Sequence, residues 1–159
     1  MNLKTNEVFV FGSNERGFHG AGGAGLACRG DSENTWRDDE WFLRAMKSPV
    51  GSEERIGRWA VYGVGKGFQE GKEGKSYAIC TVTRPGKIRS IPIKTIYEQL
   101  VELWKFADEH PELVFVISPI GEGYAGYHRW EMNETWKQVI EFHGLKPNIR
   151  FIRPPENLT

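Results

Sequence analysis

Residues 7–27 combine an apolar run with a cluster of glycines, E-V-F-V-F-G-S-N-E-R-G-F-H-G-A-G-G-A-G-L-A. Its continuously apolar part, residues 8–11, ends at Gly12 and predicts a buried strand. A glycine cluster at residues 20–25 follows, and a short helix is expected to begin near Gly22. Glycines let a ligand approach the main chain, and the unpaired N–H groups at the start of a helix attract anions. This strand, loop and helix therefore indicate a site for phosphate or another anion.

The composition indicates one domain over residues 1–159, long enough to bury a core. Its 21 basic and 21 acidic side chains give a net charge of zero, which argues against a dedicated nucleic-acid or membrane-surface protein. The N-terminal residues are polar and no apolar run approaches membrane-spanning length, so we expect a cytoplasmic protein. The two cysteines, Cys28 and Cys80, follow neither a metal-binding nor a redox spacing. We predict buried reduced thiols, no metal site and no cofactor.

A charged segment, residues 31–58, follows the first helix and carries Trp36 and Trp41 among acidic and basic residues. Its first part predicts a short helix that ends near Pro49. We interpret the whole segment as a surface excursion. A glycine-spaced loop over residues 59–76 comes next.

The remaining chain alternates strands and helices. Residues 77–82 predict a central strand, and the apolar run at residues 113–120 predicts a parallel strand covered on both faces. One helix is expected to begin at Thr95, where T-I-Y-E fits a capping box, and a second covers residues 129–143. The first of these helices carries an apolar stripe at helical spacing, formed by Ile96, Leu100, Leu103, Trp104 and Ala107. Residues 149–152 predict a last short strand. Such alternation implies an α/β layered sheet.

A second glycine-rich loop, G-E-G-Y-A-G-Y, occupies residues 121–127 after a predicted strand. Its glycines match the dinucleotide pattern G-x-G-x-x-G, but too few residues follow Gly126 to build the rest of a Rossmann fold. The run G-K-E-G-K-S at residues 71–76 lacks the first glycine of a P-loop, which would replace Gln69, and it precedes a strand. Neither nucleotide motif is therefore assigned.

The two glycine loops are expected to lie together. In open α/β sheets, ligands bind at the carboxyl ends of the strands, where loops of this kind meet. We therefore expect the two loops to hold the two ends of a diphosphate-containing ligand. The alternative is that both loops are only tight strand-to-helix connections, although each carries more glycines than a turn requires.

Four side chains in the loops are candidates for ligand contact. His19 could touch a ligand or carry a proton near neutral pH, and the alternative is a histidine that only binds backbone groups. Glu122 is a candidate general base, although its charge would repel a phosphate unless it points away. Tyr124 and Tyr127 are candidates for stacking on a sugar or a base, with core packing as the alternative.

Five motifs occur in order between residues 8 and 127: V-F-V-F-G-S-N, H-G-A-G-G-A, Y-G-V-G-K-G-F, S-Y-A-I-C-T and I-G-E-G-Y-A-G-Y. Together they resemble a group of small bacterial and phage proteins, and that group is similar to macro domains, the ADP-ribose-binding modules. The resemblance implies a three-layer α/β/α domain with a mixed, largely parallel central sheet, in which residues 31–58 are an insertion. For a phage-encoded member it implies the host cytoplasm.

The resemblance also assigns roles by position. Asn14 corresponds to the macro-domain asparagine beside the distal ribose, where it is a candidate to position a water molecule. Residues 20–23 correspond to the loop around the same ribose and phosphate, and residues 121–127 to the loop around the diphosphate. The lysine and aspartate of one hydrolytic branch are replaced here by Thr83-Arg84 and Ala125. No complete catalytic constellation is therefore present, and the upstream aspartate that reads adenine has no counterpart.

We predict a domain that binds ADP-ribose or a related nucleotide-diphosphate sugar between the two glycine loops, with hydrolysis of an ADP-ribosyl linkage as a further option. One alternative is an accessory protein that acts through protein contacts at residues 31–58, since Trp and Arg are enriched in interface hot spots. Another is a protein that sequesters a nucleotide signal without turnover. The expected ligand-binding residues are Gly12, Ser13, Asn14, His19, Gly20, Ala21, Gly22, Gly23, Gly121, Glu122, Gly123, Tyr124, Ala125, Gly126 and Tyr127.

Overall fold

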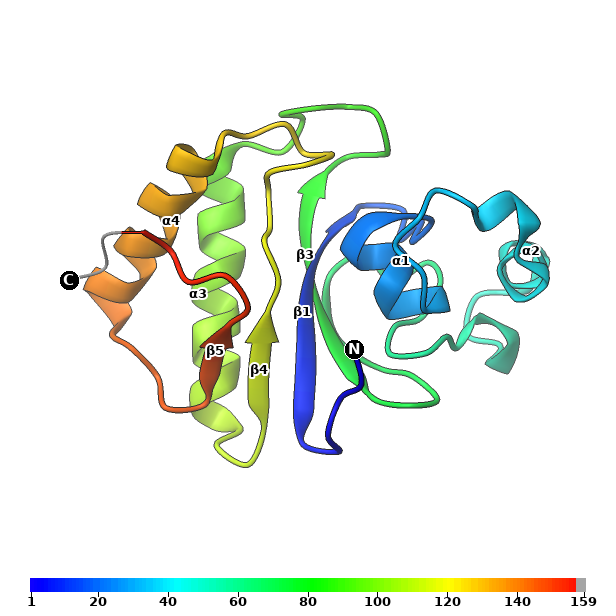
Figure 1. The fold of residues 1–159 in the computed structure, drawn as a ribbon, viewed down its shortest axis with the longest axis horizontal. Coiled ribbons are helices and arrows are strands. Elements are labelled where there is room, and N and C mark those ends of the chain that lie inside the picture. The colour runs from blue at the N-terminus through cyan, green and yellow to red at the C-terminus, as the bar shows by residue number, and fades with distance from the viewer. Residues whose placement is uncertain (157–159) are drawn as a thin grey trace.

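The computed structural model describes residues 1–156, which form a five-stranded sheet with helices on both faces (Figure 1). The strand order across the sheet is β2-β3-β1-β4-β5. The fold class is therefore α/β, as the alternation of predicted elements indicated. In chain order the elements are β1 (Glu7–Asn14), α1 (Gly22–Arg29), the short 3-10 helix η1 (Trp36–Asp38), α2 (Glu40–Lys47), the 3-10 helix η2 (Glu53–Arg55), β2 (Gly67–Glu70), β3 (Lys75–Val82), α3 (Ile93–Glu109), β4 (Val114–Ile117), α4 (Arg129–His143) and β5 (Ile149–Phe151).

Strand β1 lies at the centre of the sheet. It pairs in parallel with β3 on one side and with β4 on the other, and β5 continues the parallel set beyond β4. Only β2 runs the other way, paired with β3. The sheet is thus mixed and largely parallel, as predicted. The carboxyl ends of β1, β3 and β4 consequently meet at one edge of the sheet.

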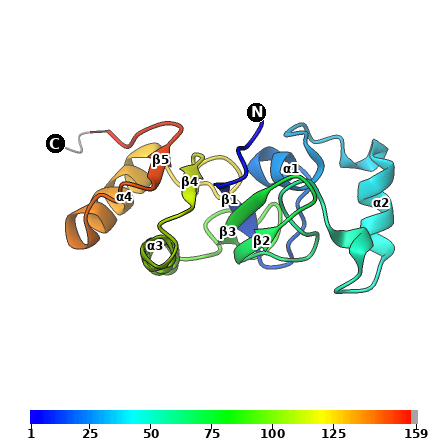
Figure 2. The same cartoon turned by 90° about the horizontal axis from the view of Figure 1, so that it is seen from below.

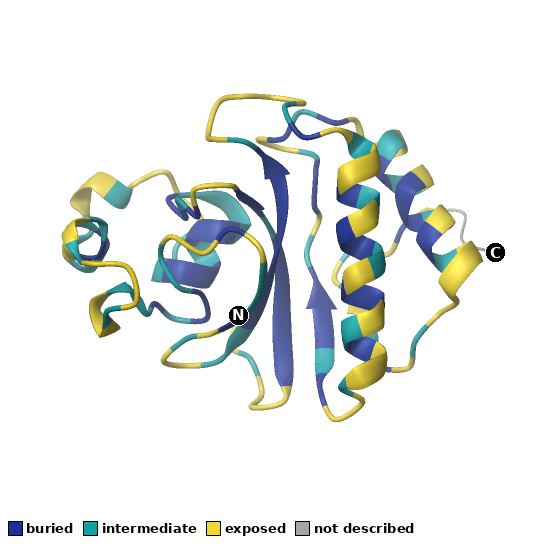
Figure 3. Ribbon diagram, turned by 180° about the vertical axis from the view of Figure 1, so that it is seen from behind, coloured by how far each residue is buried: buried dark blue, intermediate teal, exposed yellow. Residues whose placement is uncertain are grey.

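Successive side chains of β1 enter two different cores, because neighbouring residues of a strand point to opposite faces. Val8 and Val10 belong to the core formed with α3 and α4, and Phe9 and Phe11 belong to the core formed with α1. All four side chains are at most 1% exposed. Figure 3 shows the same pattern, with the central strands buried between the two helical layers. The chain therefore folds into three layers, α/β/α.

Helices α3 and α4 lie on one side of the molecule, and α1 and α2 lie on the other (Figures 1 and 2). The apolar stripe predicted for α3 is confirmed, since every member is buried against the sheet. The stripe consists of Ile96, Leu100, Leu103, Trp104 and Ala107.

None of the helices within residues 1–156 is both long and apolar enough to cross a bilayer.

Residues 31–58 are more than a surface excursion. The predicted short helix is present as α2, but its inner face buries Phe42 and Ala45 completely. The Phe42 ring packs edge-on against Phe18 and Tyr62, with 5.4 Å between ring centroids in both pairs. The interpretation as a surface excursion was therefore wrong for this face. The many charged residues around Phe42 in the sequence gave no indication that its ring is part of the core.

Two local predictions were wrong. The expected loop over residues 59–76 contains strand β2, whose four residues are too short to show a clear alternation. Helix α3 begins at Ile93, after Pro92, so Thr95 lies inside the helix and caps nothing. Proline is compatible with the start of a helix because its φ is already fixed near the helical value, and here it decides the boundary. Helix α4, in contrast, has the predicted bounds.

Candidate functional site

A cleft of about 530 Å³ opens at the carboxyl ends of β1 and β3. Its floor comes from the last residues of these two strands, and its sides come from the first glycine loop, residues 34–37 and the turn after β3. This is the edge at which open α/β sheets bind ligands. The lining residues are Gly12, Ser13, Asn14, Arg16, Phe18, Gly20, Ala21, Ala24, Asn34, Trp36, Arg37, Thr81, Val82, Pro85, Gly86 and Tyr124.

The cleft has a positive lining. Arg16 and Arg37 both contribute to it, whereas no aspartate or glutamate does. Among the described residues, neither arginine forms an ion pair. The whole chain carries equal numbers of acidic and basic groups, so this lining is a local concentration of charge. Unpaired guanidinium groups are suited to bind phosphate or carboxylate.

The start of helix α1 adds further hydrogen-bond donors. The N–H of Gly22 donates to the carbonyl of Ser32 at 2.8 Å, but those of Gly23 and Ala24 have no acceptor among the described residues. Ala21 and Ala24 line the cleft, so this end of the helix faces it. No acidic side chain occupies the first turn. The positive end of the helix dipole therefore adds to the charge of the two arginines.

Residues 34–37 form one wall of the cleft, which we call the 34–37 wall. Within it, the Arg37 guanidinium lies over the Trp36 ring, 4.3 Å from its centroid. The Trp36 ring in turn meets Phe18 edge-on at 5.0 Å and lies against Gly20. A Cβ on Gly20 would come within 2.8 Å of the Trp36 ring, so only glycine permits this approach.

Tyr124 faces the first glycine loop from the other side. Its side chain is 64% exposed, and a Cβ on Gly22 would lie 3.2 Å from its ring. The two glycine loops therefore meet, as the sequence led us to expect. Among residues 121–127, however, only Tyr124 lines the cleft. The opposite wall comes mainly from residues 34–37, which the sequence did not indicate.

The structure divides the expected ligand-binding residues into two sets. Six of them line the cleft, and the other nine do not. The six are Gly12, Ser13, Asn14, Gly20, Ala21 and Tyr124, and the others are His19, Gly22, Gly23, Gly121, Glu122, Gly123, Ala125, Gly126 and Tyr127.

Asn14 uses both ends of its amide to hold the first loop. Its Nδ2 donates to the carbonyl of Phe18 at 2.8 Å, and its Oδ1 accepts from the N–H of Phe18 at 3.0 Å. The side chain is buried, with 5% of the residue exposed. These contacts fix the turn that carries Arg16. They give Asn14 a structural role beside the one that the resemblance implied.

His19 does not reach the cleft, which corrects its expected ligand contact. The residue is 0% exposed, with Nε2 bonded to the Val64 carbonyl at 2.8 Å and its ring edge-on to Phe11. Burial lowers the pKa of His19 to about 4, although the hydrogen bond to the Val64 carbonyl opposes the shift. His19 is therefore a neutral core residue at physiological pH.

Tyr127 and Glu122 of the second loop contact residues outside the cleft, which corrects the ligand contacts expected for both side chains. Tyr127 is buried, donates its hydroxyl to the Ile91 carbonyl, and carries the Arg89 guanidinium over its ring at 4.8 Å. Glu122 pairs with Arg153 and does not line the cleft. Neither side chain is placed to stack on a sugar or to act as a base in the cleft.

The glycines of the second loop have different surroundings. Gly121 has a φ of +81°, and a Cβ there would lie 2.5 Å from the Met132 sulfur, so glycine is required for packing. Gly126 is held in the same way against Ile88, with a φ of +82°. Gly123 has open space where a Cβ would be. Two of the three glycines thus shape the loop for structural reasons.

The described cleft offers no activated nucleophile. Both cysteines are buried away from it, and burial raises the pKa of Cys28 to about 12 and that of Cys80 to about 11. No histidine, aspartate or glutamate lines the cleft that could accept a proton. The arrangement can hold an anion between cationic groups and hydrogen-bond donors, but it lacks the usual groups for general acid–base catalysis.

Comparisons of the chain with family models, curated proteins and solved structures find no match.

Proposed function

We propose that this protein binds ADP-ribose or a related nucleotide-diphosphate sugar in the cleft beside the first glycine loop. The observation that carries the proposal is the charge of the lining: two unpaired arginines and the open start of α1, with no carboxylate among them. A diphosphate supplies the negative charge and the acceptor oxygens that such a lining requires. The five sequence motifs resemble a group of small bacterial and phage proteins that is similar to macro domains, and this resemblance supports the same ligand class.

In the proposed complex, the diphosphate lies at the start of α1, within reach of Arg16 and Arg37. The exposed ring of Tyr124 lies against Gly22 of the glycine loop, and the stacked pair of Trp36 and Arg37 lies against Gly20. Flat surfaces of this kind stack on bases and sugars. A ligand with a central diphosphate and a ring at each end therefore fits better than a mononucleotide.

Binding without turnover is the form of this function that the lining favours. The one expected catalytic residue, Asn14, has its amide engaged with Phe18. No histidine, aspartate or glutamate of the described chain lines the cleft. We therefore propose a binding or sequestering protein in preference to an ADP-ribosyl hydrolase.

Calorimetry with ADP-ribose, ADP, ribose 5-phosphate and pyrophosphate tests the proposal. ADP-ribose should bind most tightly, and added salt should weaken its binding because the contacts are ionic. Replacing both Arg16 and Arg37 by Ala should weaken binding by roughly a hundredfold or more. Arg44→Ala is the matched control, because Arg44 is an exposed arginine of α2 outside the cleft.

Two results would contradict the proposal. One is the absence of binding heat at millimolar ADP-ribose. The other is an equal loss of affinity in the control variant Arg44→Ala. Incubation of the protein with an ADP-ribosylated peptide for several hours should release no ADP-ribose, and a steady release would overturn the preference for binding alone.

A further inference from the structure

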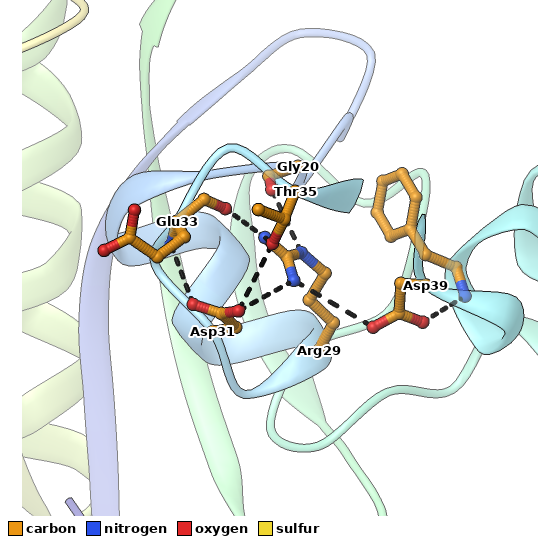
Figure 4. A network of polar contacts seen from close by, with 7 residues as sticks. Gly20, Arg29, Asp31, Glu33, Thr35 and Asp39 are labelled. Carbon is orange, nitrogen blue, oxygen red and sulfur yellow. Dashed lines mark hydrogen bonds and ion pairs between the residues drawn. The ribbon is translucent and has the colours of Figure 1, made fainter. Parts of the chain in front are cut away.

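The Arg29 side chain joins two parts of the cleft that are distant from each other in the sequence (Figure 4). Arg29 is the last residue of α1, and only 3% of its side chain is exposed. On one side its Nε donates to the carbonyl of Gly20 at 3.1 Å, in the first glycine loop. On the other side its guanidinium contacts the segment that carries the 34–37 wall.

The contacts to that segment are numerous. Nη2 donates to the Glu33 carbonyl and to the Thr35 hydroxyl at 3.3 Å, and Nη1 lies 3.4 Å from Asp31 Oδ2 and 4.0 Å from Asp39 Oδ2. Asp31 is itself fixed, because its Oδ1 accepts from the Glu33 N–H at 2.9 Å and its Oδ2 accepts from the Thr35 hydroxyl. The Glu33 N–H and the Arg29 charge both lower the pKa of Asp31. One buried cation thus fixes residues on both sides of Asn34.

Within the 34–37 wall, ring packing holds Trp36 against Phe18 and Phe42. Asn34 and Arg37 are exposed, and Trp36 is half-buried against the glycine loop. Arg29 contacts Glu33 before the wall, Thr35 within it and Asp39 after it. The position of the Arg37 guanidinium in the cleft therefore depends on contacts made by a residue that does not line it.

We infer that Arg29 is a positioning residue for ligand binding: it holds the 34–37 wall against the first glycine loop so that Arg37 faces the bound anion. The inference rests on the proposed function. A guanidinium is required because it directs five donors in a fixed plane, whereas a lysine has one ammonium group and cannot reach Gly20, Glu33 and Thr35 together. Arg29 acts through Arg37 and makes no contact with the ligand itself.

A double-mutant cycle on ADP-ribose affinity tests the inference. Arg37→Ala should weaken binding roughly ten- to hundredfold, and Arg29→Lys should weaken it by a similar factor. The double variant should bind about as weakly as Arg37→Ala alone, because the second change removes a contact already lost. The matched control is Arg55→Lys, since Arg55 lies in the same region and bonds the Ser48 carbonyl at 2.8 Å, away from the wall. It should bind like the wild type.

Hydrogen exchange of the ligand-free proteins gives a second readout that needs no ligand. In Arg29→Lys, amide exchange should rise at residues 31–39 and at the glycine loop, and stay unchanged in α3 and α4. If Arg29→Lys does not fold, Thr35→Val replaces it, because this exposed residue carries one of the contacts and the substitution keeps the side-chain shape.

The outcomes separate the inference from the proposed function. The inference is overturned if Arg29→Lys binds ADP-ribose with the affinity of the wild type. It is also overturned if the losses of the two single variants simply add in the double variant. In both cases the proposed function still stands. Failure of the wild type to bind overturns the proposed function, and the exchange data then decide whether Arg29 holds the wall. Unchanged amide exchange at residues 31–39 in Arg29→Lys would show that Arg29 does not hold the wall.

Discussion

The side-chain amide of Asn14 binds the backbone of Phe18 in both directions, donating to its carbonyl at 2.8 Å and accepting from its N–H at 3.0 Å. A single buried side chain at the end of β1 thereby closes the turn that leads into the glycine loop. The turn includes Arg16, which lines the cleft, so the position of a binding residue depends on an amide at the sheet edge.

Asn14→Asp should therefore destabilise the protein by about 1–3 kcal/mol, because a carboxylate cannot donate to the Phe18 carbonyl and is repelled by it. Urea unfolding at neutral pH measures the change. Ser13→Ala is the control, since the Ser13 hydroxyl makes one weak bond at 3.4 Å and its loss should change stability by less than about 0.5 kcal/mol. Equal stabilities of the wild type and Asn14→Asp would show that the amide does not hold the turn.

Two glycines of α1 should respond to alanine in opposite directions. Alanine normally stabilises a helix by about 1 kcal/mol relative to glycine. At Gly25, however, a Cβ would lie 2.6 Å from the backbone oxygen of Asp31, so Gly25→Ala should destabilise by about 1–3 kcal/mol. At Gly23 the nearest atom would be 3.4 Å away, and Gly23→Ala should be neutral or slightly stabilising. Thermal unfolding of both variants distinguishes these signs, and stabilisation by Gly25→Ala would contradict the close packing.

The segment 31–58 should prove essential to the core. Phe42 is 0% exposed, and its ring packs against those of Phe18, Trp36 and Tyr62. Phe42→Ala should cost about 3–5 kcal/mol of unfolding free energy by leaving a cavity. Phe142→Ala provides the comparison, because Phe142 is 70% exposed and its truncation should be nearly neutral. Denaturant titration of the two variants measures the difference. Similar small effects of both substitutions would show that residues 31–58 contribute little to the core.

Acid should destabilise the protein through His19. The folded state holds this imidazole neutral with a pKa of about 4, below the ordinary value of 6.5, so only the unfolded chain gains a proton between these pH values. Stability is full above pH 6.5 and falls progressively toward pH 4, by about 3 kcal/mol. His19→Gln should remove this part of the pH dependence. Urea unfolding across this range checks the prediction, and parallel pH profiles of the two proteins would contradict it.

The sequence predicted the elements whose burial pattern is strong. The apolar run in β1 and the stripe of α3 appear in the structure as expected, because each places many apolar residues on a defined face. Short or mixed elements were not predictable in this way. Strand β2 has four residues and depends on its pairing with β3, and the start of α3 follows from Pro92 more than from the side chain of Thr95.

Half of the cleft could not be predicted because it depends on contacts between distant segments. No periodicity in residues 31–58 indicates that Trp36 lies against Gly20, since that contact joins two segments that are separated by helix α1. The sequence around a lone histidine such as His19 also does not indicate whether the side chain is buried, because histidine occurs both in exposed loops and in cores. The positions of Arg16 and Arg37 in one cleft likewise became visible only in three dimensions.

The central place of β1 in the sheet has a consequence for synthesis on the ribosome. Its neighbours begin at Lys75 and Val114, so the hydrophobic strand leaves the exit tunnel long before either partner is translated. At about 5–20 residues per second, the nascent strand waits for seconds with both edges unpaired. Its free backbone groups are open to neighbouring chains during that interval, so aggregation of the nascent chain is expected at this stage of synthesis.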